Sequence, residues 1–202
     1  NYNNCGRYDH NIPSWKLPMQ PVEAFHDSTS NKQLLDYPGV ALPGGVLAAG
    51  GDATAELNAA LDNIFEHPNV GPFIARRLIQ RLVTSNPSAA YIQRVASAFN
   101  NNGSGVRGDL KAVLRAILLD SEARYGPWQY PSIFGKLREP LLKNTQLWRA
   151  MEARTESGRV ETLSPYPGIE DWYGQGPLRS PSVFNFFQPD YRQSGEISEL
   201  GL

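Results

Sequence analysis

The sequence predicts a mainly α-helical fold: an irregular bundle of about five helices with Gly/Pro-rich loops and at most a small β-hairpin near the N-terminus. Apolar side chains recur at helical spacing across the middle of the chain. Residues 53–125 hold only 4 glycines and 3 prolines, against 6 and 5 in residues 1–52 and 8 and 8 in residues 126–202, so regular structure is expected in the middle. The 202 residues, of which 41% are hydrophobic, suffice for one or two domains with a buried core.

The first 52 residues are expected to form a loop-rich arm. Short apolar pieces such as Gln33-Leu34-Leu35 and Gly39-Val40-Ala41-Leu42 stand between turn residues, which allows a small hairpin. Cys5 is the single cysteine, so no disulfide can close within this chain. Cys5 could pair outside the chain or be an unpaired buried thiol. The opening at Asn1 indicates a processed or excised part of a longer chain.

A first helix is predicted before Pro68, with Asp52 or Thr54 as its N-cap. Its apolar residues follow the i, i+3, i+4, i+7, i+8 spacing of a one-faced helix: Leu57, Ala60, Leu61, Ile64 and Phe65. A second helix begins at Asn69, with Pro72 in its first turn. Its apolar arc covers half the circumference, which indicates packing on more than one neighbour.

Three further helices follow. The third begins after Pro87 and ends at the Asn-Gly stretch 100–103. The fourth begins at Gly108-Asp109 and repeats the spacing of the first, with Leu110, Val113, Leu114, Ile117 and Leu118 on its apolar face. If Leu114 is buried there, Leu114→Ala should destabilise the fold by about 2–5 kcal/mol.

The last predicted helix lies between about Phe134 and Ala153, with Leu137, Leu141, Trp148 and Met151 directed inward. Pro140 either kinks this helix or marks its start, and the later start is favoured. An ion pair between Arg138 and Glu139 is expected to fix that start.

The remaining tail is irregular and aromatic. Its side chains, which include Tyr166, Trp172, Tyr173, Phe184, Phe186, Phe187 and Tyr191, are expected to pack on the helices. The 202 residues are thus interpreted as a single domain, or as the C-terminal part of a larger helical domain. Its parts are an arm (1–52), a helical core (53–153) and a packed tail (154–202).

An ordered set of motifs identifies a family. The set comprises Phe25-His26-Asp27, Lys32-Gln33-Leu34-Leu35, Leu42-Pro43-Gly44-Gly45, the stretch from His67 to Pro87, Asn102 to Val113, Gly135-Lys136-Leu137-Arg138-Glu139-Pro140 and Arg179 to Phe187. Together they resemble the bacterial domain of unknown function 1800. The resemblance implies a helical fold, a longer full-length domain, and export to the periplasm or the cell exterior. It also implies an exported partner similar to phosphatases and sulfatases. It brings no catalytic residue, and it leaves the cofactor unknown.

His26 and Asp27 are the first candidates for a metal or acid/base site. A neutral imidazole and a carboxylate are ordinary ligands of zinc and iron. Adjacent residues on a strand point to opposite faces, so the two would converge only in a turn. The structural alternative is a turn in which Asp27 accepts backbone N–H bonds before Ser28-Thr29-Ser30.

His67 is a weaker metal candidate, because a histidine before Pro68 at a helix end also suits the carbonyl end of the helix dipole. His10 would need partners from outside the chain. Glu170 and Asp171 lie beside Trp172 and Tyr173, an arrangement that could hold a sugar ring against a general acid.

Arg76, Arg77 and Arg81 could clamp an anionic group, since guanidinium donors match carboxylate or phosphate. Arg77 and Arg81 are one turn apart and could act together. The alternative is a solvated face with ion pairs to neighbouring acids.

Charge and motifs restrict the function classes. The net charge of −1 gives no global field for nucleic acid or an anionic membrane, although a local basic patch is compatible with it. No apolar run reaches the roughly 18 residues of a membrane span, because Arg115 interrupts the longest. Nucleophile-elbow, Walker, dinucleotide and His-Glu-x-x-His motifs are missing. A scaffold or binding module acting with an envelope partner or polymer is favoured, and a metal- or carboxylate-dependent hydrolase of an envelope or extracellular substrate is the alternative.

Overall fold

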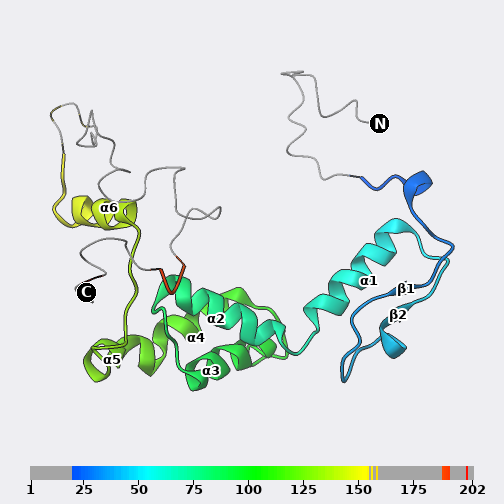
Figure 1. The fold of residues 1–202 in the computed structure, drawn as a ribbon, viewed down its shortest axis with the longest axis horizontal. Helices are drawn as coiled ribbons and strands as arrows, with labels where there is room; N and C mark the ends of the chain where they lie inside the picture. The colour runs from blue at the N-terminus through cyan, green and yellow to red at the C-terminus, as the bar shows by residue number, and fades with distance from the viewer. Residues whose placement is uncertain (1–19, 155, 157, 159–187, 192–198, 200–202) are drawn as a thin grey trace. The chain divides into compact units, whose positions relative to one another are not determined.

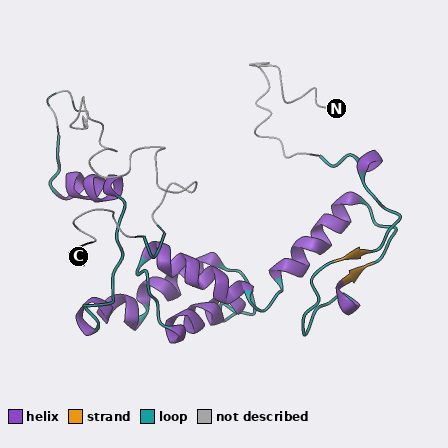
Figure 2. Cartoon of the chain, in the orientation of Figure 1, coloured by secondary structure: helices purple, strands orange, loops and turns teal. Residues whose placement is uncertain are grey.

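The computed structural model describes residues 20–154, 156, 158, 188–191 and 199, and Figure 1 shows its elements. The helices are α1 (Ala53–Phe65), α2 (Val70–Leu82), α3 (Ala89–Asn100), α4 (Leu110–Leu119), α5 (Ser121–Gln129) and α6 (Pro140–Ala150). Two short strands, β1 (Lys32–Gln33) and β2 (Val46–Leu47), pair antiparallel. The mainly α fold with a small hairpin is therefore confirmed (Figure 2).

The chain divides into two compact units, unit 1 (residues 1–70) and unit 2 (residues 71–202). Unit 1 contains the hairpin, α1 and two 3-10 turns, η3 (Glu23–Phe25) and η4 (Pro43–Gly45). Unit 2 contains α3 to α6 and all of α2 beyond its first residue. None of the helices in the described ranges is long and apolar enough to cross a bilayer.

The hairpin of unit 1 depends on a glycine. In its register Lys32 faces Leu47 and Gln33 faces Val46, and the Leu34 N–H donates to the Gly45 carbonyl at 2.8 Å. A Cβ at Gly45 would lie 2.7 Å from the Leu35 carbonyl oxygen, and the φ of Gly45 is +68°. Both facts exclude a larger residue at this position.

The α1 helix buries a polar face. Asp52 caps its start by accepting from the Ala55 N–H, as one of the two predicted caps. Buried Asn63 pairs with the backbone of Leu35, accepting from its N–H at 3.1 Å and donating to its carbonyl at 2.9 Å. Because this backbone needs polar partners, the side of α1 that carries Glu56 and Asn63 turns toward the arm.

The apolar stripe that the sequence indicates for the first helix is not the face that α1 buries in unit 1. Three members of the apolar stripe remain largely exposed among the described residues: Leu57 at 59%, Leu61 at 54% and Ile64 at 53%. The helix itself is confirmed.

The apolar core of the described residues lies entirely in unit 2. Its buried side chains come from α2 (Ala75, Ile79), α3 (Tyr91, Ile92, Val95, Ala96, Phe99) and α4 (Val113, Ile117). The Tyr91 hydroxyl donates to the Ile117 carbonyl at 2.6 Å, which satisfies a buried polar group. At Gly71 a Cβ would lie 2.8 Å from the Asn100 side-chain oxygen, so glycine permits the close approach to α3.

The α4 helix buries a narrower face than its spacing predicts. Val113 and Ile117 are fully buried, whereas Leu110, Leu114 and Leu118 are 56%, 40% and 55% exposed. Leu114 therefore does not lie in the main core of the described residues. The helices α3 and α5 contact α4, and these contacts leave the three leucines of the stripe partly exposed.

The α5 helix was not predicted, because Gly126 and Pro127 within it resemble a break. Asp120 caps it by accepting from the Glu122 N–H. The α6 helix begins at Pro140, which confirms the later of the two starts.

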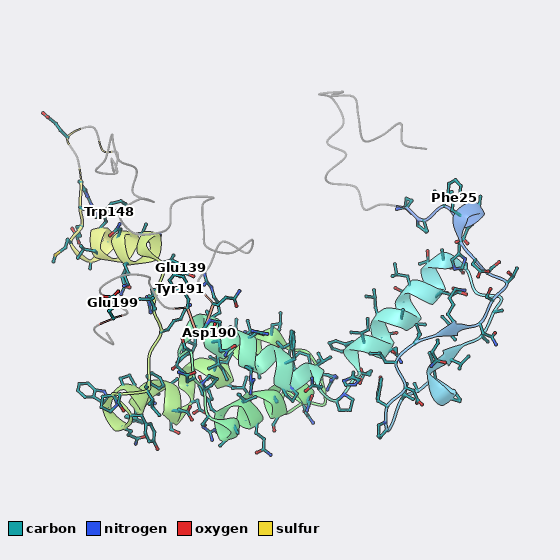
Figure 3. All side chains as sticks on the ribbon, in the orientation of Figure 1. Phe25, Glu139, Trp148, Asp190, Tyr191 and Glu199 are labelled. Carbon is teal, nitrogen blue, oxygen red and sulfur yellow. The ribbon has the colours of Figure 1, made fainter. Side chains whose placement is uncertain are left out.

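Two predicted details of the last helix are wrong. Met151 is 74% exposed and Leu137 is 40% exposed instead of being directed inward. Trp148, which Figure 3 labels on α6, is half-buried. Glu139 pairs with Arg81 in place of Arg138, which donates to Gln146. The tail residues 159–187, predicted to pack on the core, lie outside the described residues.

Candidate functional site

The imidazole of His26 lies between two carboxylates. The η3 turn positions it, since the His26 N–H donates to the Glu23 carbonyl at 3.0 Å. On one side of the ring, Nε2 lies 2.8 Å from Glu56 Oε2. On the other side, Nδ1 lies 3.4 Å from Glu23 Oε2, an ion-pair distance that is too long for a good hydrogen bond.

Lys32, from β1, completes what we call the His26 cluster: Glu23, His26, Lys32 and Glu56. Lys32 Nζ lies 2.7 Å from the same Glu56 oxygen that faces His26. The hydrogen bond from Lys32 lowers the pKa of buried Glu56, and the one from His26 adds to this, while burial opposes both. Gly51 leaves the space for this carboxylate, because a Cβ there would lie 2.9 Å from Glu56 Cγ.

The cluster ties the arm to α1. Glu23 also accepts from the Ala53 N–H, at 3.0 and 3.3 Å, and so satisfies a free donor at the start of the helix. Both ring nitrogens of His26 thus face carboxylates within the protein. No group of three or more His, Cys, Asp or Glu side chains within the described ranges is placed to hold a metal ion.

Asp27 forms its own turn. Its Oδ1 accepts from the Thr29 N–H and hydroxyl at 2.9 Å each and from the Ser30 N–H at 3.2 Å, and its Oδ2 accepts from the Ser30 hydroxyl at 2.6 Å. These bonds, led by the Ser30 hydroxyl, hold the pKa of Asp27 well below its usual range. This turn is the structural alternative that the sequence analysis gave for Asp27. The side chains of His26 and Asp27 have separate partners, because Asp27 contacts Thr29 and Ser30 whereas His26 contacts Glu23 and Glu56.

His67 lies just beyond the end of α1. Its Nδ1 accepts from the Asn69 N–H at 3.1 Å, and its ring meets the Tyr37 ring edge-on at 4.7 Å between centroids. The Tyr37 hydroxyl donates to the Asn63 carbonyl at 2.8 Å. His67 is thus part of the packing that joins the arm to the C-terminal end of α1.

The three candidate arginines do not converge. Arg81 contacts buried Glu139 at 2.5 Å, and the Arg77 guanidinium lies 5.5 Å from the centre of the Phe73 ring. Arg76 is exposed. Arg77 and Arg81, which the sequence allowed to act together, contact different partners in the structure. Glu170 and Asp171, the other candidate acids, lie outside the described residues.

Sequence reasoning missed the partners of these residues. Glu56 and Asn63 share a face of α1 with the small side chains Ala59 and Ala60 between them, a signal that could have indicated a closely packed polar face. A bidentate pair between Arg94 and Asp120, at 2.7 and 2.8 Å, spans 26 residues and carries no local signal.

Comparison with known proteins gives one match. Residues 18–199 match a family described as a protein of unknown function, DUF1800. Neither the curated proteins nor the solved structures give a match. The matched range covers most of the chain and extends over the larger part of each unit. The chain therefore belongs to the DUF1800 family.

Proposed function

We propose that this chain is a helical binding module that acts with an exported partner protein in the periplasm or outside the cell, and that the exposed apolar face of α1 contacts this partner. The observation that carries the proposal is the stripe of Leu57, Leu61 and Ile64, each more than half exposed. Their i, i+4, i+7 spacing is the one by which an amphipathic helix enters an apolar groove.

The pattern of buried side chains in unit 1 makes this stripe unusual. Every buried apolar side chain of the described residues belongs to unit 2, whereas the buried side chains of α1 are Glu56 and Asn63. A helix that turns its polar face inward presents its apolar face for another contact. Apolar surface of this kind, next to polar residues, is typical of protein interaction sites.

The charged residues support binding over chemistry. Asp27 is held by its turn, His26 lies between Glu23 and Glu56, and Arg81 contacts Glu139. Each of these candidates is engaged in a contact that holds the fold. These contacts give no specific support to the alternative function, a metal- or carboxylate-dependent hydrolase that uses His26 and Asp27.

The partner class follows from the family, which led us to expect an exported protein similar to phosphatases and sulfatases. The test places a photo-crosslinking amino acid at Leu61 in the full-length protein, and at exposed Asp62 as the control, more than 90° around the helix. We expect a stoichiometric crosslink to such a protein from position 61 and little from position 62.

A second measurement fixes the interpretation. With purified partner, the double variant Leu57→Ser/Leu61→Ser should weaken binding at least about tenfold, while Asp62→Ser leaves it unchanged. Crosslinks from position 61 that stay within the chain would show that α1 is covered internally, and the proposal would be abandoned.

A further inference from the structure

The exposed leucines of α4 form a second apolar stripe. Leu110, Leu114 and Leu118 are 56%, 40% and 55% exposed, and we call them the α4 stripe. The residues of the α1 stripe, on which the proposed function rests, are Leu57, Leu61 and Ile64. At the rise of an α-helix each stripe extends about 10–12 Å along its axis, so the described residues present two apolar faces of similar length.

Two cations border the α4 stripe. At the angular spacing of a helix, Lys111 and Arg115 lie about 60° and 100° from Leu114, and both are exposed. The acid just before the stripe, Asp109, is engaged in the fold, because it caps α4 and accepts from the Asn102 amide at 2.8 Å. Within the described residues neither cation forms an ion pair. The α4 stripe is therefore an apolar face with a cationic border.

Charge is distributed unequally between two parts of the chain. Residues 20–70, which include α1, hold seven acids and one cation. Residues 71–119, which include α4, hold seven cations and one acid. Two of these cations, Arg81 and Arg94, pair with acids further along the chain. The part that carries the α4 stripe remains positive even so, while the part that carries the α1 stripe is strongly negative.

These observations select a second copy of the chain as the occupant of the α4 stripe. Oppositely charged surfaces attract and orient each other before apolar side chains make contact. Each chain offers an acidic part with one apolar stripe and a basic part with another, so two copies can associate head to tail. Pairing of two α4 stripes would instead bring like charges together, which is unfavourable.

We propose that the α1 stripe of one chain packs against the α4 stripe of a second copy, and that this contact masks α1 until the exported partner displaces it. The second half of this inference rests on the proposed function, because it concerns the regulation of the same α1 stripe. One helix pair buries less than the roughly 1,200–2,000 Å² of a stable interface. The contact is therefore weak, with a dissociation constant on the order of 10–100 µM, and dilute protein is monomeric.

The test is sedimentation equilibrium of the full-length protein without partner, from about 1 to about 500 µM. The mean mass should rise with concentration, and salt should reduce this rise. Leu114→Ser/Leu118→Ser and Lys111→Glu/Arg115→Glu should each weaken association at least about tenfold. The control Trp128→Ser changes a side chain that is 85% exposed and belongs to neither stripe, and it should leave association unchanged.

Mixing two variants shows which stripes meet. Leu57→Ser/Leu61→Ser retains an intact α4 stripe, and Leu114→Ser/Leu118→Ser retains an intact α1 stripe. Each variant alone should be monomeric, whereas an equimolar mixture should form dimers and nothing larger, because only one complementary contact is available. Far-UV circular dichroism of each variant checks that the fold is retained.

Three results would overturn the proposal: a wild-type chain that stays monomeric throughout, association that survives both α4 variants, and a variant mixture that stays monomeric. Excess purified partner should convert the assemblies into complexes with one copy of the chain, and complexes that keep two copies would overturn the masking of α1. Crosslinking to the partner from position 61 at about 1 µM, where the chain is monomeric, tests the proposed function alone. Failure of either proposal can thus be recognised separately.

Discussion

Replacement of Ile117 by alanine should destabilise unit 2 by about 3–4 kcal/mol. Ile117 is fully buried in the core formed by α2, α3 and α4. The change removes three carbon groups, which costs about 2.4 kcal/mol of transfer free energy at about 0.8 kcal/mol each. A residual cavity of about 50 Å³ adds about 1.2 kcal/mol.

Leu118→Ala is the matched control, one residue further along α4. It removes the same number of carbon groups from a side chain that is 55% exposed. Because the side chain is already half exposed, less than half of the transfer free energy of these carbon groups is lost, and no cavity forms. The free energy of unfolding should therefore fall by about 1 kcal/mol.

Urea unfolding followed by circular dichroism measures both free energies, and an unchanged m-value shows that the comparison is valid. Equal costs for the two variants, within about 0.5 kcal/mol, would refute the assigned orientation of α4. A larger cost for Leu118→Ala would show that a part of the protein outside the described residues covers the leucine stripe.

Three further substitutions test other contacts. Gly126→Ala should cost about 1–3 kcal/mol, because its Cβ would overlap the Phe134 ring, and thermal unfolding would detect the loss. The lowered pKa of Glu56 contributes stability that is present above the ordinary value of 4.5 and is lost as pH falls through the lower value of the folded state. The protection of α1 against hydrogen exchange, taken relative to the intrinsic exchange rate at each pH, should therefore fall below about pH 4.5 in wild type. Glu56→Gln should remove this dependence, and an unchanged profile would contradict the role of the carboxylate. Arg81→Ala should lower the free energy of unfolding by about 1–3 kcal/mol, since it leaves the buried carboxylate of Glu139 without this cation. The control Arg76→Ala should change it by no more than about 0.5 kcal/mol. Equal urea midpoints for the two variants would refute the importance of the Arg81 contact.

Local sequence signals predicted the helices well. Capping residues such as Asp52 and Asp109 accept backbone N–H groups where the sequence placed helix starts, and Pro140 stands at the first position of α6. Helix caps and first-turn prolines depend only on residues within one turn of each other, so they can be recognised in the sequence without knowledge of tertiary contacts. The α5 helix escaped detection because Pro127 follows Gly126, and the tertiary contact with Phe134 compensates for that pair.

The orientation of the helices could not be predicted in the same way. Periodicity identifies an apolar stripe but does not say which neighbour covers it. In α1 the neighbour is a backbone segment that needs polar partners, so Asn63 turns inward and Leu61 outward.

The candidate site was predictable only in part. His26 and Asp27 were identified by residue type, but the contact between His26 and Glu56 joins positions 30 residues apart and has no local signal. The contact between Arg81 and Glu139 spans 58 residues and escapes sequence reasoning for the same reason.

The polar interior of unit 1 has a calorimetric consequence. The heat capacity increment of unfolding comes mainly from newly hydrated apolar surface, and the described part of unit 1 keeps Leu57, Leu61 and Ile64 hydrated already when folded. Among the described residues, the unfolding of unit 1 should therefore contribute little to the heat capacity change, and the larger share should come from α2, α3 and α4. Association of a partner with α1 would in turn give a negative heat capacity change, because the water around those side chains is released only then.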